Sequence, residues 1–388
     1  MEIGAVIIFL AFLLIAAPFL SAFAKIPVVV VEMLLGVFGA YIGLLKGFEV
    51  FDMLAHFGFL YLMFLVGMEV DLREFRFGKT SLLKRTALFF VTLYLLSIAA
   101  TLYFNLNMIY IAVFSIFSLG VLMALVKEYG KKEAWLILAV NVGVIGELLS
   151  IILMIVLSSG LKSGFNLQFL VTISILLGFL VLFVFVFKMA KVLFWWFPEL
   201  KIILMPHKDN KDIDIRLSMA LMFILIALMI IVGIDQVLGA FLAGLFIVSF
   251  FKHKTELPEK LSSFGFGFLV PLFFIHVGST LPLDVFTDKE VLKQAFFIFA
   301  SIVSIRLISS VVAYSGHFGL KNATLFSLGN SMPLTFLVAI ATLAHNTQNI
   351  SDKEYYAIVV ASMISAVVLM IVIKILHQYF FKKHKVQL

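Results

Sequence analysis

Two ionisable side chains lie deep inside long apolar runs of the sequence, and any chemistry has to be built from them first. Glu147 lies within NVGVIGELLSIILMIVLSS, residues 141–159, and Arg306 lies midway along the apolar run 294–316. Burying either charge without a partner costs about 2.5–3.5 kcal/mol even on the most lenient membrane-insertion scale. A charge that is kept at such a cost indicates a functional site.

Two interpretations of this pair are open. Glu147 and Arg306 could form a structural ion pair, although buried pairs often add little net stability over apolar packing. Alternatively, Glu147 lies on an ion path. Removal from water favours the protonated form of a carboxylic acid, and the ionised form offers a hard oxygen ligand to a partly dehydrated cation. One carboxyl that holds a proton or a transported monovalent cation, but not both, is the simplest device for exchanging the two. Arg306 would then partly offset the desolvation or supply the positive charge of the empty site.

The composition indicates that lipid surrounds these residues. The chain has 388 residues, of which 63% are hydrophobic and 13% charged, and its mean hydropathy is +1.17. Soluble domains are about 45–50% apolar and about 25% charged. Cysteine is absent, which excludes disulfides and thiolate metal sites. The eight histidines show no metal-ligand spacing, so we expect no cofactor.

The apolar runs predict an all-α polytopic membrane protein, because stretches of about 17–25 apolar residues recur along the chain and are long enough to cross about 30 Å of hydrocarbon as helices. The thirteen predicted segments are residues 3–22, 26–45, 54–69, 86–105, 109–126, 134–158, 167–187, 217–234, 236–250, 264–281, 294–316, 322–345 and 355–373. Six helices, one linking helix and six more would form two inverted repeats, which is the usual build of secondary transporters. The domains would be a first repeat at 1–158, a linking helix with a cytoplasmic linker at 159–216, and a second repeat with a basic tail at 217–388.

The distribution of basic residues supports this count. Of the 29 Lys and Arg residues, 23 fall in one set of alternate loops and five in the other. Since cytoplasmic loops are the basic ones, the N-terminus is expected outside and the C-terminus in the cytoplasm of a bacterial-type inner (plasma) membrane. The net charge of +7 then reflects topology and contact with the lipid bilayer, and we expect no nucleic-acid partner.

The fifth helix of each predicted repeat carries small, polar or helix-breaking residues at membrane depth, in FSIFSLG (114–120) and in SLGNSMPLT (327–335). Interrupted helices at matching positions of two repeats are the best sequence indication of a midplane site. The simpler alternative is that Pro333 kinks a packed helix while Ser115 and Ser118 bond to carbonyls of their own helix. The residues expected at the two interruptions are Ser115, Leu119, Gly120, Gly329, Asn330, Ser331 and Pro333.

Four stretches, in the family's order, resemble motifs of the cation:proton antiporter superfamily, specifically its Kef-type and bacterial sodium/proton exchanger branch. They are VEMLLGVFGAYIGL (31–44, the loosest match), GFLYLMFLVGMEVDLREFR (58–76), LGAFLAGLFIV (238–248) and FLVPLFFIHVGSTL (268–281). The resemblance implies about thirteen helices in inverted repeats with two crossed, discontinuous helices. It also implies a homodimer, and exchange of monovalent cations for protons.

The resemblance further implies roles for single residues, with departures. The family's ion-binding helix usually carries Asp-Asp, Asn-Asp or Gln-Asp, whereas Gly146–Glu147 stand here. The acid is therefore kept as Glu and its polar neighbour is missing. Ser118 matches the first discontinuous helix without the family's Thr, and Arg306 matches a basic residue of the core. The stretch Met332–Thr335, at the second crossing, carries no charge.

The predicted ion ligands are Glu147, Ser118 and Asn141, although Asn141 lies about 120° from Glu147 around the helix. A single acid favours one-for-one, electroneutral exchange of Na⁺, K⁺ or Li⁺ for protons by alternating access. The alternative hypothesis is a gated potassium-efflux channel-like protein, or a non-transporting membrane subunit derived from antiporters. The missing polar groups favour it somewhat. An enzyme is not expected, because the sequence offers no nucleophile–base constellation.

Overall fold

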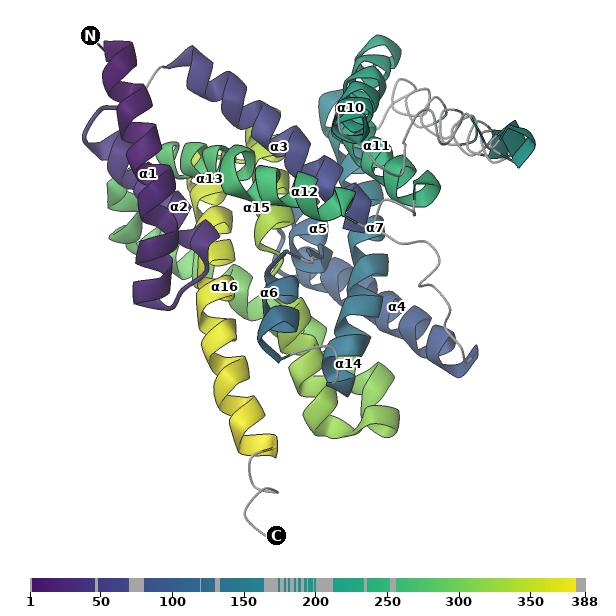
Figure 1. The fold of residues 1–388 in the computed structure, drawn as a ribbon. Helices are drawn as coiled ribbons and strands as arrows, with labels where there is room; N and C mark the ends of the chain where they lie inside the picture. Colours follow the sequence, from purple (N-terminus) through teal and green to yellow (C-terminus); the bar gives the residue numbers. More distant parts are fainter. Residues whose placement is uncertain are drawn as a thin grey trace, which may run out of the picture. The chain divides into compact units, whose positions relative to one another are not determined.

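The structure is a computed structural model. It describes residues 2–45, 48–69, 80–118, 120–129, 133–163, 212–233, 236–251 and 256–381, together with isolated positions between 174 and 199. Within these residues every regular element is a helix (Figure 1), and seven of the helices are long and apolar enough to cross a membrane. The all-helical prediction is therefore confirmed. It follows from the solvent, because a helix satisfies its own backbone hydrogen bonds in lipid.

The helices form two compact units, each assembled from separate stretches of the chain. Unit 1 comprises Met1–Phe19, Glu32–Arg73 and Ser158–Thr280, and unit 2 comprises Leu20–Val31, Glu74–Leu157 and Leu281–Leu388. Each unit therefore takes residues from both halves of the sequence.

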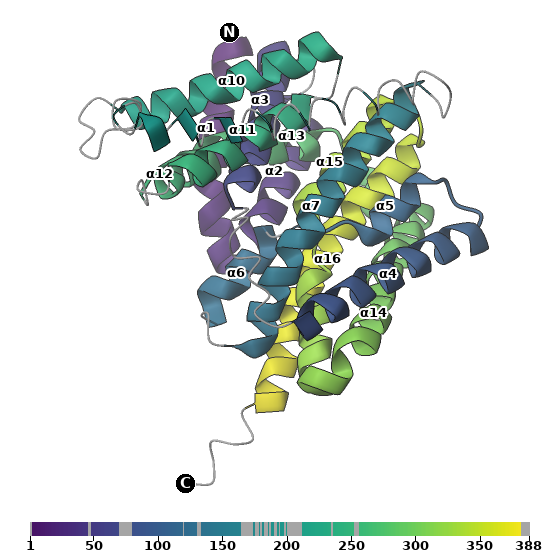
Figure 2. The ribbon, with the colours of Figure 1, turned by 90° about the vertical axis from the view of Figure 1, so that its right-hand side faces the viewer.

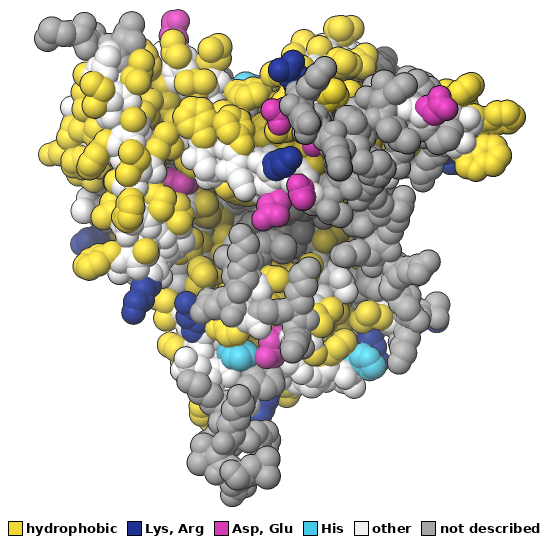
Figure 3. Space-filling model, in the orientation of Figure 1, with side chains coloured by type: hydrophobic (Ala, Val, Ile, Leu, Met, Phe, Trp, Pro, Cys, Tyr) yellow, Lys and Arg dark blue, Asp and Glu magenta, His cyan; other side chains and the backbone are white. Residues whose placement is uncertain are grey.

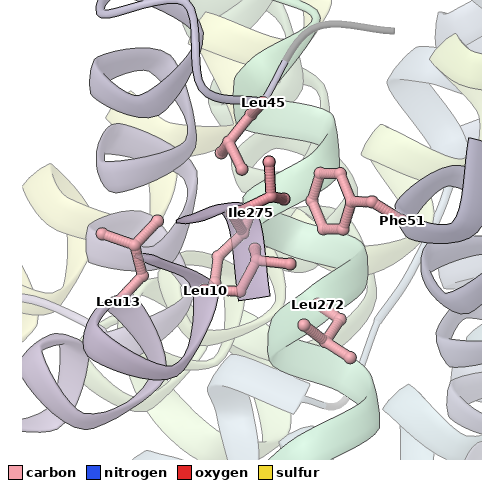
Figure 4. Close-up of a cluster of buried hydrophobic side chains, with 7 residues drawn as sticks. Leu10, Leu13, Leu45, Phe51, Leu272 and Ile275 are labelled. Carbon is pink, nitrogen blue, oxygen red and sulfur yellow. The ribbon is translucent and has the colours of Figure 1, made fainter. Parts of the chain in front are cut away.

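Unit 1 is a bundle of apolar helices. Its elements are α1 (Glu2–Ala24, to Phe19), α2 (Val28–Tyr41, from Glu32), α3 (Glu49–Glu69), α10 (Ile213–Val232), α11 (Gln236–Phe250) and the continuous run α12 (Leu257–Phe264), η1 (Gly265–Leu269) and α13 (Val270–Ser279). Helix α3 packs against α11 and α13, and α10 packs against α11. Buried side chains of α1, α3 and α13 meet in the cluster drawn in Figure 4, which includes Leu10, Phe51 and Ile275.

Glycines set how closely the helices of unit 1 approach one another. A methyl group on Gly36 of α2 would collide with the backbone carbonyl of Ile275, and one on Gly278 of α13 would collide with the backbone of Met33. The same holds for Gly244 of α11 against the backbone of α3. These helices therefore touch backbone to backbone, which is how packing gains energy in a solvent as apolar as the side chains themselves.

Unit 2 contains the residues predicted to do chemistry. Its elements are α4 (Thr80–Tyr103), α5 (Ile109–Ser115), α6 (Gly120–Tyr129), α7 (Ala134–Ser163, to Leu157), the short η2 (Leu283–Phe286), α14 (Lys289–Asn330), α15 (Leu334–Asn346) and α16 (Asp352–Phe381). Helix α14 packs against α4 and α16, and α15 packs against α5 and α16 (Figure 2).

Helix α14 is bent sharply at Gly319, whose φ of 76° lies in the left-handed region that glycine adopts without strain. The Ser310 hydroxyl donates a hydrogen bond of 2.7 Å to the carbonyl of Ala323 across this bend. The bend therefore separates the predicted segment 294–316 from the start of the predicted segment 322–345.

Within the described residues the helices overlap the predicted segments but differ from them at their ends, and the segments 109–126 and 322–345 are each interrupted. The run that begins at Leu257 was expected from residue 264. Its first turns bury Leu257 and Leu261 while Glu259 lies outside the core, so their mean hydropathy is low. The linking helix at 167–187 lies, apart from isolated positions, outside the described residues.

Helix α1 exposes apolar side chains along its length, including those of Ile8, Phe12 and Phe19. Figure 3 shows hydrophobic groups over that face.

Candidate ion-binding site

The first interrupted helix lies in unit 2. Helix α5 ends at Ser115, and Ile116 has the extended φ and ψ of −70° and 140°. Helix α6 begins at Gly120, while Leu119 lies outside the described residues. We call residues 116–118 the break. Because they leave the helical conformation inside buried surroundings, their polar groups need partners from elsewhere.

Three consecutive residues of the break are held by three different helices. The Ile116 carbonyl accepts a hydrogen bond from Nη2 of Arg306 on α14. The Phe117 N–H donates to Oγ of Ser150 on α7 at 2.7 Å. The Ser118 hydroxyl is hydrogen-bonded to the Thr335 hydroxyl on α15. The break is thus the point at which α7, α14 and α15 are joined.

Glu147 lies on the turn of α7 that packs against this break. Its side chain is 1% exposed. The preceding residue, Gly146, has no side chain, and a methyl group there would collide with the ring of Phe117. Ser150 lies one turn further along α7 and contacts the same Phe117. The helix bearing the acid is therefore in direct contact with the break on both sides of Glu147.

Arg306 is fully buried, and its guanidinium carbon lies 4.9 Å from the centroid of the Phe117 ring. The structural ion pair with Glu147 stays a prediction. The positive charge of Arg306 faces a carbonyl at the C-terminus of α5, where the helix dipole is negative. The cation–π contact with Phe117 adds to this.

The second interruption lies between α14 and α15. Gly329 and Asn330 are the last residues of α14, whereas Ser331 and Pro333 lie between the two helices. Asn330 Nδ2 donates to the Phe326 carbonyl at 3.1 Å, and the Ser331 hydroxyl donates to the Ser327 carbonyl at 2.7 Å. These polar groups are therefore satisfied by their own helix.

Two predicted residues are less closely tied to Glu147. Asn141 is half-buried on α7, and among the described residues no hydrogen bond joins it to the break. The Ser115 hydroxyl donates to the Ile111 carbonyl one turn earlier at 2.7 Å, as the simpler interpretation of that serine expected.

The structure adds Thr335 and Ser150, which were not predicted as site residues. Thr335 ends the uncharged stretch of the second crossing, and its hydroxyl meets Ser118. Ser150 follows Glu147 by three residues, a spacing that places both on one face of a helix. That spacing was the available signal. It is weak, because serines in membrane helices commonly bond to their own backbone.

The residues at the break and on the helices that contact it include one carboxyl, that of Glu147, and three hydroxyls, those of Ser118, Ser150 and Thr335. Among the described residues no group of three His, Asp or Glu side chains is placed to hold a metal ion. A multivalent metal favours several charged ligands. One carboxyl with neutral oxygens suits a proton or a monovalent cation.

Comparison with known proteins identifies the family. Residues 8–378 match the family described as sodium/hydrogen exchanger, transmembrane. The chain belongs to this family. A Bacillus subtilis (strain 168) protein provisionally named Na(+)/H(+) antiporter YjbQ is 28% identical over 372 residues, which are 88% of this chain and 58% of the relative. The chain thus spans less than two thirds of that relative's length.

A second relative, provisionally named Na(+)/H(+) antiporter 3, comes from Methanocaldococcus jannaschii and is 26% identical over 90% of each chain. Among solved structures, the sodium proton antiporter MjNhaP1 from the same organism, determined at pH 8, superposes with a TM-score of 0.66. It covers 98% of both chains at 15% sequence identity. At that identity the likeness establishes only the fold of the present chain. The assignment of the present chain to the Kef-type branch stays a prediction.

Proposed function

We propose that this family member exchanges Na⁺ or K⁺ for protons at Glu147. The observation that carries the proposal is a buried carboxyl on a helix that packs against an interrupted helix. The names of the two relatives support the same exchange. When Glu147 is protonated it binds no cation, and when a cation binds it the proton must leave. Ser118 and Thr335 would supply neutral oxygens, with Li⁺ as a further candidate substrate.

We also propose one proton per cation, and therefore electroneutral exchange. Glu147 has Gly146 beside it, where a second polar group would otherwise stand. Arg306 donates its hydrogen bond to the Ile116 carbonyl at the C-terminus of α5, so the proposal counts Glu147 as the one acid that exchanges its proton. One titrating acid moves one charge in each direction, so no net charge crosses the membrane.

The composition of the two units supports the proposed architecture of thirteen helices in inverted repeats. Unit 1 takes the first three and the eighth to tenth predicted segments, and unit 2 takes the fourth to sixth and the eleventh to thirteenth. Such a division is expected when each unit contains the same part of both repeats. Unit 2 would expose Glu147 to alternate faces of an inner membrane, with the N-terminus outside. The homodimer is proposed from the family resemblance.

Flux in liposomes tests this function. With an acidic interior, external Na⁺ or K⁺ is expected to dissipate the proton gradient, at a rate independent of a clamped membrane potential. Glu147→Gln, which keeps the size but not the titration, is expected to reduce exchange to the level of empty liposomes. Glu290→Gln removes an exposed carboxylate of unit 2 and is the control. Exchange by Glu147→Gln at the wild-type rate would exclude this residue, and cation current without a proton gradient would indicate the channel.

A further inference from the structure

The hydroxyl of Ser150 makes two hydrogen bonds to two different elements. It donates to the Gly146 carbonyl of its own helix at 2.7 Å and accepts the Phe117 N–H of the break at 2.7 Å. The side chain is fully buried. A hydroxyl whose donor and acceptor roles are both taken is fixed in orientation, so it holds one backbone atom of the break in register with the turn that carries Glu147.

In the described part of unit 2, two other buried serines, Ser97 and Ser309, show no such second bond. The Ser97 hydroxyl donates to the Leu93 carbonyl at 2.8 Å, and the Ser309 hydroxyl donates to the Ile305 carbonyl at 2.8 Å. Both bonds stay within one helix, which is the common behaviour of serine in apolar helices. Within the described part of unit 2, Ser150 differs from these two in binding the backbone of another element.

The contact bears on the site because Phe117 is the central residue of the break. Its ring lies between Gly146 and Arg306, and the next residue carries the Ser118 hydroxyl. Without the Ser150 hydroxyl, the Phe117 N–H would be a buried donor without a partner, and such a group forces local rearrangement. A shift of Phe117 displaces the oxygen of Ser118 relative to Glu147.

We propose that Ser150 is a positioning residue for ion exchange, which fixes the break so that its oxygens and Glu147 face the same cation. The proposal rests on the proposed function. Ser150 acts through Phe117 and does not touch the cation. Its loss therefore weakens cation binding, while the protonation of Glu147 and the maximal rate are largely kept.

The test compares Ser150→Ala, Ser150→Thr and the matched control Ser97→Ala in liposomes. Ser150→Ala is expected to raise the half-saturating cation concentration roughly 3- to 10-fold, the range given by one lost neutral hydrogen bond. At a fixed cation concentration, its inhibition by protons should begin at higher pH, because the cation competes less well. Ser150→Thr restores the hydroxyl and should restore both values. Ser97→Ala loses a buried hydroxyl bond of the same kind and should change neither.

Folded Ser150→Ala with the wild-type half-saturation and pH profile would overturn the proposal, as would equal changes in Ser97→Ala. If Ser150→Ala is not recovered from the membrane, Ser150→Cys takes its place, because a thiol is a weaker donor and acceptor. An intermediate half-saturation is then expected, and a wild-type value overturns the proposal. Wild-type protein without exchange would instead refute the proposed function itself.

Discussion

Helices of unit 1 meet where side chains are missing, whereas the helices around the break of unit 2 meet through polar groups. Gly36 and Gly278 bring α2 and α13 into backbone contact. In unit 2, Arg306, Ser150 and Thr335 each bind one residue of an extended segment. Glycine contacts need no partners and hold a frame together. Burying polar groups at membrane depth is costly unless each forms a hydrogen bond. The polar contacts therefore indicate that the functional site lies in unit 2.

The largest effect is expected when the polar contact between Arg306 and the break of unit 2 is removed. Arg306→Met removes a hydrogen bond from a charged donor, which is worth about 1.5–3 kcal/mol, and it leaves the C-terminus of α5 without its cation. We expect a clear loss of thermal stability in detergent and nearly complete loss of exchange. Arg306→Lys keeps the charge but not the planar fork and should be intermediate. A methionine variant as stable and active as the wild type would contradict this role.

A second effect should separate stability from exchange in unit 1. Gly36→Ala places a methyl group on the Ile275 carbonyl, and overpacking of this kind costs about 1–3 kcal/mol. The melting temperature should fall, while exchange per folded molecule should stay at the wild-type level, since no predicted ion ligand lies in unit 1. Gly4→Ala is the control, because nothing lies within 4 Å of the added atom. A changed cation affinity in Gly36→Ala would place part of the site in unit 1.

The smallest effect is expected at Thr335. Thr335→Val keeps the shape but removes the hydroxyl bond to Ser118, worth about 0.5–1.5 kcal/mol. The half-saturating cation concentration should rise a few-fold, with little change in melting temperature. Thr101→Val is the control, because that buried hydroxyl donates to the Ser97 carbonyl of its own helix at 2.8 Å. Equal behaviour of the two variants in transport would remove Thr335 from the site.

Much of the helical organisation could be predicted from the sequence. Long apolar runs indicate helices surrounded by lipid, and glycine, proline and serine within such runs indicate where a buried helix is interrupted. The depth of Glu147 was predicted for the same reason. The partner of Arg306 was not, since a buried cation can face a carboxylate or a carbonyl, and spacing does not distinguish them. Ser150 and Thr335 were missed because each bonds to a residue of the break that no local pattern connects to it, 33 positions away for Ser150 and 217 for Thr335.

Proton release on cation binding tests the central claim most directly. The purified protein is titrated with Na⁺, K⁺ or Li⁺ in weakly buffered detergent while a pH indicator reports released protons. If Glu147 holds a proton and a cation in turn, the wild type should release close to one proton per bound cation at a pH where Glu147 is protonated. Glu147→Gln should release none. Cation binding by the wild type without proton release, or equal release by Glu147→Gln, would contradict the account.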